Sequence, residues 1–156
     1  MIISGFPGIG KSWLASMSMR IVDLESSSFF VDGKRPEGWL EMYVNVAEHL
    51  DSQNKIVFVS SHSAVREEMN RRALEFLTIY PSLELKDKWL GMLRHRYDST
   101  KSEKNLRALE YMEKYYDEAV NDCSLESWVV ELNDTPEKYY NECRWNDWKE
   151  KLRFID

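Results

Sequence analysis

Short apolar runs alternate with amphipathic segments along the whole chain. The apolar runs predict strands at residues 2–4, 20–24, 55–60, 74–80 and 128–132. Apolar residues at helical spacing predict helices at 11–19, 36–50 and 63–72, and further helices that begin at 82, 102 and 135. Alternating strands and helices are typical of a parallel sheet with right-handed crossovers. We therefore expect one α/β domain over residues 1–156, with a five-stranded, mostly parallel sheet flanked by helices.

A glycine-rich segment follows the first predicted strand. Residues 5–12 read Gly-Phe-Pro-Gly-Ile-Gly-Lys-Ser, which fits the phosphate-loop pattern G-x-x-x-x-G-K-S, with a strand before it and a helix after it. The backbone N–H groups of such a loop cradle phosphates, and the dipole of the following helix favours the same anion. The pattern predicts the three-layer P-loop NTPase fold and the binding of ATP with Mg²⁺. The expected nucleotide-binding residues are Gly5, Pro7, Gly8, Ile9, Gly10, Lys11, Ser12 and Trp13.

Within this loop, two side chains carry specific expectations. Lys11 is expected to reach the β and γ phosphates and to act in catalysis, and the Ser12 hydroxyl is expected to bind Mg²⁺. Parallel sheets bind ligands beyond the carboxyl ends of their strands. Further chemistry is therefore expected directly after residues 24, 60, 80 and 132.

Composition narrows the class of partner. The chain has 156 residues and a net charge of −6, which does not favour nucleic acid as a partner, although a local basic site is still allowed. No apolar run approaches the roughly 20 residues that span a bilayer, and the first residues do not resemble a signal peptide, so we expect a cytoplasmic protein. Cys123 and Cys143 have no metal-binding spacing. A monomer and a homodimer both remain open.

Beyond the loop, Asp23-Leu24-Glu25 ends the second predicted strand. With this pair and the loop, the chain resembles the small P-loop kinases: nucleoside monophosphate kinases, shikimate kinase and gluconate kinase. By that resemblance, one carboxylate helps to organise Mg²⁺ and the other receives the acceptor hydroxyl. We assign Asp23 to metal, catalysis and substrate binding, and Glu25 to substrate binding; a solvated strand end is the alternative.

Ser60-Ser61-His62 follows the third predicted strand, and Arg66 lies on the helix after it. This arrangement resembles that of gluconate kinase-like proteins, and the resemblance implies substrate-binding roles for His62 and Arg66. A histidine that caps a helix or faces solvent is the alternative for His62. Many P-loop proteins place a metal-binding aspartate at this strand end. The sequence has none there, so the metal would depend on Ser12, water and Asp23.

Arg94-His95-Arg96 lies near the end of the helix after the fourth strand. In the kinases that the chain resembles, arginines at this place open a short lid and clamp the transferring phosphoryl group. Guanidinium suits that task because it is planar and always charged. We assign Arg94 and Arg96 to catalysis, with a small lid at about 94–104 built around residues 97–103. A solvated helix end is the alternative.

The same resemblance places the acceptor-binding segment at about residues 26–50. Phe29, Phe30, Trp39 and Tyr43 lie there and could stack on a base or form core. The favoured function is transfer of the γ-phosphate of ATP to a small acceptor, foremost a nucleoside or deoxynucleoside monophosphate. The alternatives are a kinase for another hydroxyl, such as a sugar acid or a hydroxymethylated base in DNA, and a P-loop NTPase or nucleotide-gated binding protein without an acceptor. The chain is also similar to small nucleotide kinase-like proteins encoded by bacteriophages.

Overall fold

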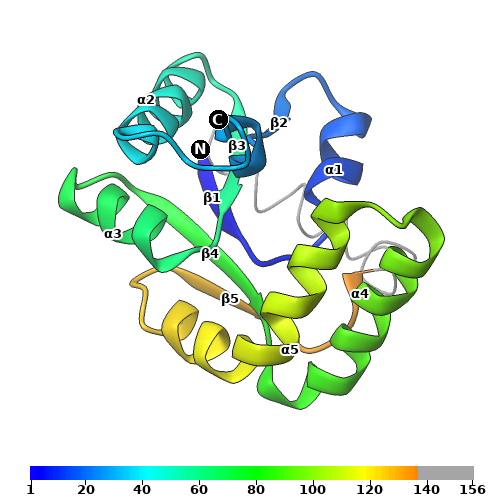
Figure 1. Cartoon of the computed structure of the whole chain (residues 1–156). Coiled ribbons are helices and arrows are strands. Elements are labelled where there is room, and N and C mark those ends of the chain that lie inside the picture. The colour runs from blue at the N-terminus through cyan, green and yellow to red at the C-terminus, as the bar shows by residue number, and fades with distance from the viewer. Residues whose placement is uncertain (137–156) are drawn as a thin grey trace.

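In the computed structural model, residues 1–136 are described (Figure 1). Their five strands are β1 (Ile2–Gly5), β2 (Ile21–Asp23), β3 (Ile56–Ser60), β4 (Phe76–Pro81) and β5 (Val129–Leu132). They form one sheet in the order β2-β3-β1-β4-β5, and each neighbouring pair among them is parallel. The predicted α/β fold class is confirmed, with strands close to the expected bounds.

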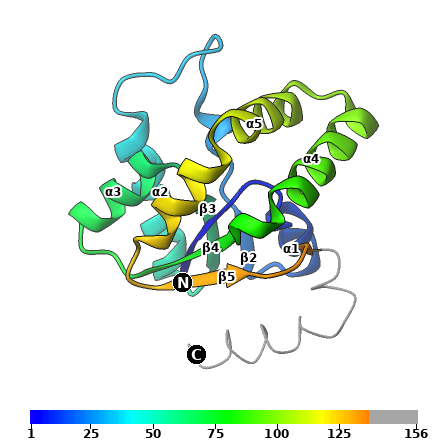
Figure 2. The ribbon, with the colours of Figure 1, turned by 90° about the horizontal axis from the view of Figure 1, so that it is seen from below.

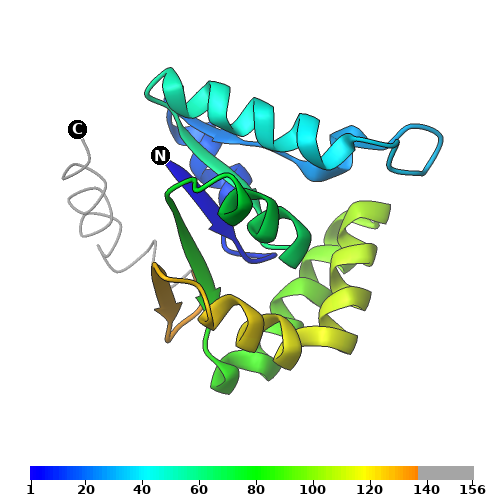
Figure 3. The ribbon, with the colours of Figure 1, turned by 90° about the vertical axis from the view of Figure 1, so that its left-hand side faces the viewer.

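Helices cover both faces of this sheet, as Figure 3 shows for α2 and the pair α4–α5. One face is covered by α2 (Trp39–Ser52) and α3 (Ser63–Arg71), which pack on alternate residues of β3, Val57 and Val59. The other face is covered by α1 (Lys11–Met17), α4 (Lys86–Thr100) and α5 (Glu103–Ser124). Two short 3₁₀ helices, η1 (Ser26–Phe29) and η2 (Leu83–Leu85), lie in the connections. Burial on both faces explains why β3 is apolar throughout.

The connection between α4 and α5 differs from the expected lid. Residues 97–103 were expected to form a small loop, but α4 continues to Thr100 and α5 begins at Glu103. Lys101 closes α4 with φ 49°, and the Ser102 hydroxyl accepts the Asn105 N–H as the N-cap of α5. Two residues therefore suffice to reverse the chain, and α4 and α5 form an antiparallel pair (Figure 2). Residues 94–104 are mostly helical for this reason.

The predicted helix from residue 135, with Tyr139, Tyr140, Cys143, Trp148 and Leu152 along it, lies outside the described residues. Cys143 lies outside them as well. Cys123 is buried on α5, where burial raises its thiol pKa to about 11 and keeps it protonated.

One buried hydroxyl ties together the carboxyl ends of two strands. Tyr43 on α2 is fully buried, and its hydroxyl donates to the Leu24 carbonyl at 2.7 Å. The same oxygen accepts the N–H of Ser60 at 2.9 Å. The bridge sets the distance between the chain that leaves β2 and the chain that leaves β3. Tyr43 is therefore part of the core and also shapes the edge of the sheet.

We predict that Tyr43→Phe lowers the free energy of unfolding by about 1–3 kcal/mol, because it leaves a partly buried carbonyl and a partly buried N–H without their partner. Urea unfolding of the two proteins measures the difference. Tyr97→Phe is the matched control, since the Tyr97 hydroxyl has no hydrogen bond to residues 1–136 and its loss should have little effect. Equal stability of Tyr43→Phe and the parent would contradict the structural role of the bridge.

Candidate phosphate-binding site

The loop of residues 5–12, called the P-loop from here on, joins β1 to α1 at the carboxyl edge of the sheet. The Phe6 N–H donates to the Ile79 carbonyl of β4 at 3.0 Å, so the loop begins fixed to the neighbouring strand. A Cβ on Gly5 would lie 2.6 Å from Ile9 Cδ1 and 2.9 Å from Lys11 Cδ. Only glycine allows the loop to close this tightly around the lysine.

Lys11 is folded into the loop. Its Nζ donates to the Gly5 carbonyl at 2.7 Å and to the Phe6 carbonyl at 3.3 Å. Burial lowers the pKa of Lys11 to about 8, and the carboxylates of Asp23 and Glu25 oppose part of that shift. A desolvated ammonium held by carbonyl oxygens alone is stabilised further by an anion, so the lysine is prepared for a phosphate.

Ser12 and Asp23 lie side by side where α1 begins and β2 ends. The Ser12 hydroxyl donates to Asp23 Oδ2 at 2.6 Å. The other carboxylate oxygen, Oδ1, is buried and has no hydrogen bond to the described residues. An unpartnered buried carboxylate oxygen beside a hydroxyl is a donor set that fits Mg²⁺, which usually takes one or two carboxylates together with water and substrate phosphates.

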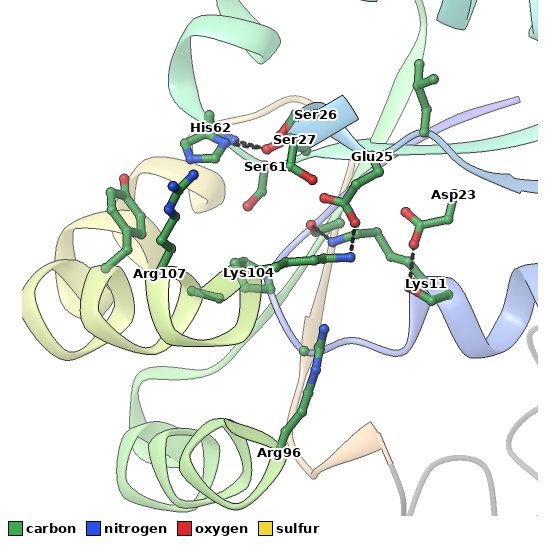
Figure 4. A pocket seen from close by; sticks show the side chains of 18 of the residues that line it. Lys11, Asp23, Glu25, Ser26, Ser27, Ser61, His62, Arg96, Lys104 and Arg107 are labelled. Atoms are coloured by element: carbon green, nitrogen blue, oxygen red, sulfur yellow. Dashed lines mark hydrogen bonds and ion pairs between the residues drawn. The ribbon is translucent and has the colours of Figure 1, made fainter. Parts of the chain in front are cut away.

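These groups line one pocket of about 770 Å³. The P-loop and the end of β2 form one side, and residues 24–35 continue from there. The facing wall is formed by α4 and α5, which contribute Arg96, Lys104, Arg107 and Tyr111 (Figure 4). The pocket therefore extends well beyond the space at the P-loop itself.

On that facing wall, Lys104 forms an ion pair with Glu25 across the pocket. Arg96 reaches from α4 toward Lys11 and has no carboxylate partner within residues 1–136 (Figure 4). Arg107 pairs with Glu103 one turn earlier, and its guanidinium lies 5.5 Å from the Phe30 ring centre. The wall is positively charged where it faces the P-loop.

The end of the pocket away from the P-loop carries a second cation, Arg35, which is only partly desolvated. The guanidinium of Arg35 stacks on the Trp39 ring at 3.9 Å, and its Nη2 donates to the Ser26 hydroxyl at 3.4 Å. Its Nε is buried and has no hydrogen bond to the described residues. Partial burial lowers the pKa of Arg35, and no carboxylate of residues 1–136 forms an ion pair with it. Such a cation favours an anionic ligand.

His62 also lines the pocket, at the N-cap of α3. Its Nδ1 is hydrogen-bonded to the Ser60 hydroxyl. Burial lowers the pKa of His62 to about 4, and the charges of Arg35 and Lys11 lower it further. The imidazole is therefore neutral at pH 7 and can offer a hydrogen bond without a charge.

Most of the predicted site residues come together in this pocket. Gly5, Pro7, Gly8, Gly10, Lys11, Ser12, Trp13, Asp23, Glu25, His62 and Arg96 all line it. The Ile9 side chain is instead buried in the core, so only its backbone is available to a ligand.

Arg66 and Arg94 lie elsewhere. Arg66 is 2% exposed and forms ion pairs with Asp122 and Glu126 at the end of α5, which ties α3 to α5. Arg94 forms an ion pair with Glu113 on the outer face of the α4–α5 pair and is largely exposed. Neither lines the pocket, so we omit Arg66 from the substrate-binding residues and Arg94 from the phosphoryl clamp.

Three cationic residues of the pocket were not expected from the sequence: Arg35, Lys104 and Arg107. Two of them had a detectable signal, because Lys104, Arg107 and Tyr111 follow helical spacing and must share one face of α5. Arg35 lies in an irregular segment and had no such signal. Of the aromatic residues in the acceptor segment, Tyr43, Phe29 and Trp39 pack in the core, whereas Phe30 lines the pocket.

Residues 1–136 include no helix that is both long and apolar enough to cross a membrane. They also contain no cluster of three or more histidine, cysteine or acidic residues that could hold a metal alone. A metal at Ser12 and Asp23 would therefore need ligands from a bound phosphate and water.

The comparisons with known proteins concern the fold. No protein-family model matches the chain, and no curated protein matches it either. The crystal structure of shikimate kinase from Bacteroides thetaiotaomicron is similar to it, with a TM-score of 0.57 and 13% sequence identity. The similarity covers 97% of this chain and 96% of that chain. At this identity it shows the fold alone: the chain has the α/β fold of that shikimate kinase, a five-stranded parallel sheet flanked by helices.

Proposed function

We propose that this protein transfers the γ-phosphate of ATP to a small anionic acceptor, and that the acceptor is a nucleoside or deoxynucleoside monophosphate. The charges at the two ends of this pocket carry the proposal. One end is the P-loop with Lys11, Ser12 and Asp23, and the other end holds Arg35, which has no carboxylate partner within residues 1–136. A protein that only binds or hydrolyses a nucleotide has no need of a second cationic end.

The P-loop end suits the donor nucleotide. Lys11 would exchange its two carbonyl partners for the β and γ phosphates. Its desolvated positive charge would then have an anionic partner. Ser12 and Asp23 Oδ1 would hold Mg²⁺, and the ion would neutralise charge on the β and γ phosphates. Trp13, half exposed at the start of α1, lies beside the P-loop in the same pocket.

The far end suits the acceptor. Arg35 and Arg107 both lie beside the Phe30 ring, at 5.2 Å and 5.5 Å from its centre. Two guanidinium groups next to an aromatic face provide charge for a phosphate and a surface for a base. This combination favours a nucleotide over a sugar acid, which has the anion but no planar base.

Arg96 reaches from α4 toward Lys11 at the P-loop end, where charge would develop during transfer. An acceptor oxygen attacks the γ-phosphorus in line, a new P–O bond forms, and the bond to the β–γ bridging oxygen breaks so that ADP leaves. A phosphate acceptor brings an oxygen that is already ionised. A hydroxyl acceptor would give its proton to Glu25 or Asp23. The protein contributes positioning and fixed positive charge, which are the main needs of this reaction.

Glu25 and Lys104 would orient the acceptor together. Their ion pair spans the pocket from the end of β2 to α5 (Figure 4). An incoming acceptor can accept from the Lys104 ammonium or donate to the Glu25 carboxylate. His62, which is neutral, adds a hydrogen-bonding group without changing the charge of the site. The arrangement therefore provides polar contacts of both kinds.

We predict that Arg96→Ala lowers turnover by roughly 10²-fold or more, the low side of arginine contributions to phosphoryl transfer, with little change in ATP affinity. Arg94→Ala is the matched control, because it removes an arginine from the same helix that does not face the pocket. Transfer from γ-labelled ATP to a panel of nucleoside monophosphates, nucleosides, sugar acids and hydroxymethylated DNA measures the effect.

The same assay separates the competing functions. Transfer to a sugar acid or to DNA, with none to nucleotides, would replace the proposed acceptor and keep the kinase. Slow hydrolysis that no acceptor changes would contradict the kinase and support an NTPase. Equal losses in Arg94→Ala and Arg96→Ala would show that the helix, and not the Arg96 charge in the pocket, is what the reaction needs.

Lys11 makes ATP binding sensitive to pH. A triphosphate binds the charged lysine best, and the lysine in the nucleotide-free protein loses its proton with a pKa of about 8. ATP affinity should therefore be nearly constant well below that pKa and fall roughly tenfold between about pH 7.5 and pH 9. The fall arises because Lys11 must take up a proton before ATP binds tightly. Calorimetric titration at several pH values measures this slope. The variant Lys11→Met should bind ATP weakly and with no such slope; an equal slope in both proteins would assign the titration to another group.

A further inference from the structure

Residues 6–9 of the P-loop form a β-turn. The Ile9 N–H donates to the Phe6 carbonyl at 3.3 Å, and Pro7 and Gly8 are the two central residues. Gly8 has φ 91°, whereas proline keeps φ near −65°. Negative φ at the second position and positive φ at the third are those of a type II turn. A type I turn would differ mainly by rotation of the peptide between Pro7 and Gly8.

The orientation of this peptide decides whether the loop can bind a phosphate. In a trans peptide the C=O and N–H groups point in opposite directions. When the Pro7 carbonyl points toward α4, where Trp89 binds it, the Gly8 N–H must point away from α4, and Gly8 lines the pocket. A flipped peptide would instead direct a carbonyl oxygen toward the phosphates, and the two would repel.

Trp89 on α4 holds the carbonyl in that orientation. Its indole Nε1 donates to the Pro7 carbonyl at 2.8 Å, and the side chain is fully buried. The Phe6 ring packs edge-on against the indole, with 6.3 Å between ring centres. A Cβ on Gly8 would lie 2.8 Å from Met92 Cε and 3.2 Å from the same indole nitrogen. The turn therefore packs directly against α4.

The helix face under the turn also carries Arg96. Trp89, Leu93 and Arg96 are spaced by four and three residues, so they form one stripe along about two turns of α4. Trp89 and Leu93 are buried near the P-loop, and Arg96 lines the pocket. Any shift of α4 along this stripe moves the support of the turn and the Arg96 guanidinium together.

We propose that Trp89 is a positioning residue for nucleotide binding: through the Pro7 carbonyl it fixes the turn that presents the Gly8 N–H to a phosphate, and it sets the P-loop in register with Arg96. The inference rests on nucleotide binding by the P-loop, one part of the proposed function, and on nothing about the acceptor. Trp89 does not line the pocket, so its effect would act through the peptide that it holds.

The test compares Trp89→Phe with Tyr116→Phe. Tyr116 is an equally buried aromatic residue that packs edge-on against Phe6, with 5.7 Å between ring centres, and its hydroxyl donates to the Ser82 carbonyl at 3.0 Å. Each variant therefore loses one hydrogen bond from a buried aromatic side chain to a backbone carbonyl. Calorimetry gives the ATP affinity, and thermal unfolding without nucleotide gives the stability.

Trp89→Phe should weaken Mg²⁺-dependent ATP binding roughly tenfold, the effect of losing one well-oriented hydrogen bond to a charged group. Tyr116→Phe should lose stability but bind ATP within about twofold of the parent, since its bond does not orient the turn. ATP binding by Trp89→Phe as tight as by the parent would overturn the inference and leave the proposed function intact. A parent protein that binds no ATP would overturn both.

A second measurement on the parent protein applies even when Trp89→Phe does not fold. Exchange of the Trp89 indole hydrogen with deuterium, followed by NMR, requires the bond to Pro7 to open. Saturating ATP should slow that exchange several-fold, because a bound phosphate holds the Gly8 N–H and opposes the flip of the peptide. An exchange rate that ATP leaves unchanged would contradict the coupling between Trp89 and the P-loop.

Discussion

Parallel pairing of β1 with β3 and β4 brings the chemistry of this molecule to one edge of the sheet. Gly5 pairs in register with Ser60 on one side and with Ile79 on the other, so the P-loop and the segment with His62 must leave the sheet side by side. The pairing of β2 with β3 adds Asp23 to the same edge. No long-range side-chain contact is needed to gather these groups, because the strand register already places them together.

The wall that faces this edge is positioned by helix packing and not by strand register. It belongs to α4 and α5, which pack on the opposite face from α2 and α3 and cross the pocket as an antiparallel pair. α5 bends at Tyr115, where the backbone leaves helical geometry with φ −125°. The half before the bend carries Lys104, Arg107 and Tyr111 toward the pocket and packs in the core through Leu109 and Met112. The half after the bend continues that core through Tyr116 and Val120. One helix therefore serves both the site and the core.

Local sequence signals predicted the elements and the P-loop, because both depend on short-range chemistry. Glycine, lysine and serine at fixed spacing require only their own neighbours, and an apolar run between turns predicts a strand wherever it lies. The arginines could not be sorted in this way. Arg94 and Arg96 are two residues apart, which on a helix means nearly opposite directions, and only the way α4 packs decides which of them faces the pocket.

Arg66 shows the same limit at longer range. Its position after the third strand fitted a substrate ligand, but its partners Asp122 and Glu126 lie far along the chain on and beyond α5. A buried guanidinium with two carboxylates is already neutralised, whereas Arg35 stays without a carboxylate of the described residues. What separates a structural arginine from a ligand-binding one here is the presence of acidic partners, and this depends on tertiary contacts that the local pattern does not contain.

The central claim is that the pocket is complementary to a phosphoryl group in transfer, and binding of MgADP with fluoroaluminate tests it most directly. This complex imitates the transferring group, and transition-state analogues bind about 10²-fold or more tighter than ground-state ligands. With a nucleoside monophosphate present, the fluoroaluminate complex should bind at least about 10²-fold tighter than MgADP alone, and Arg96→Ala should lose most of that gain. Equal affinity for MgADP with and without fluoroaluminate, in the presence of every acceptor, would contradict the account.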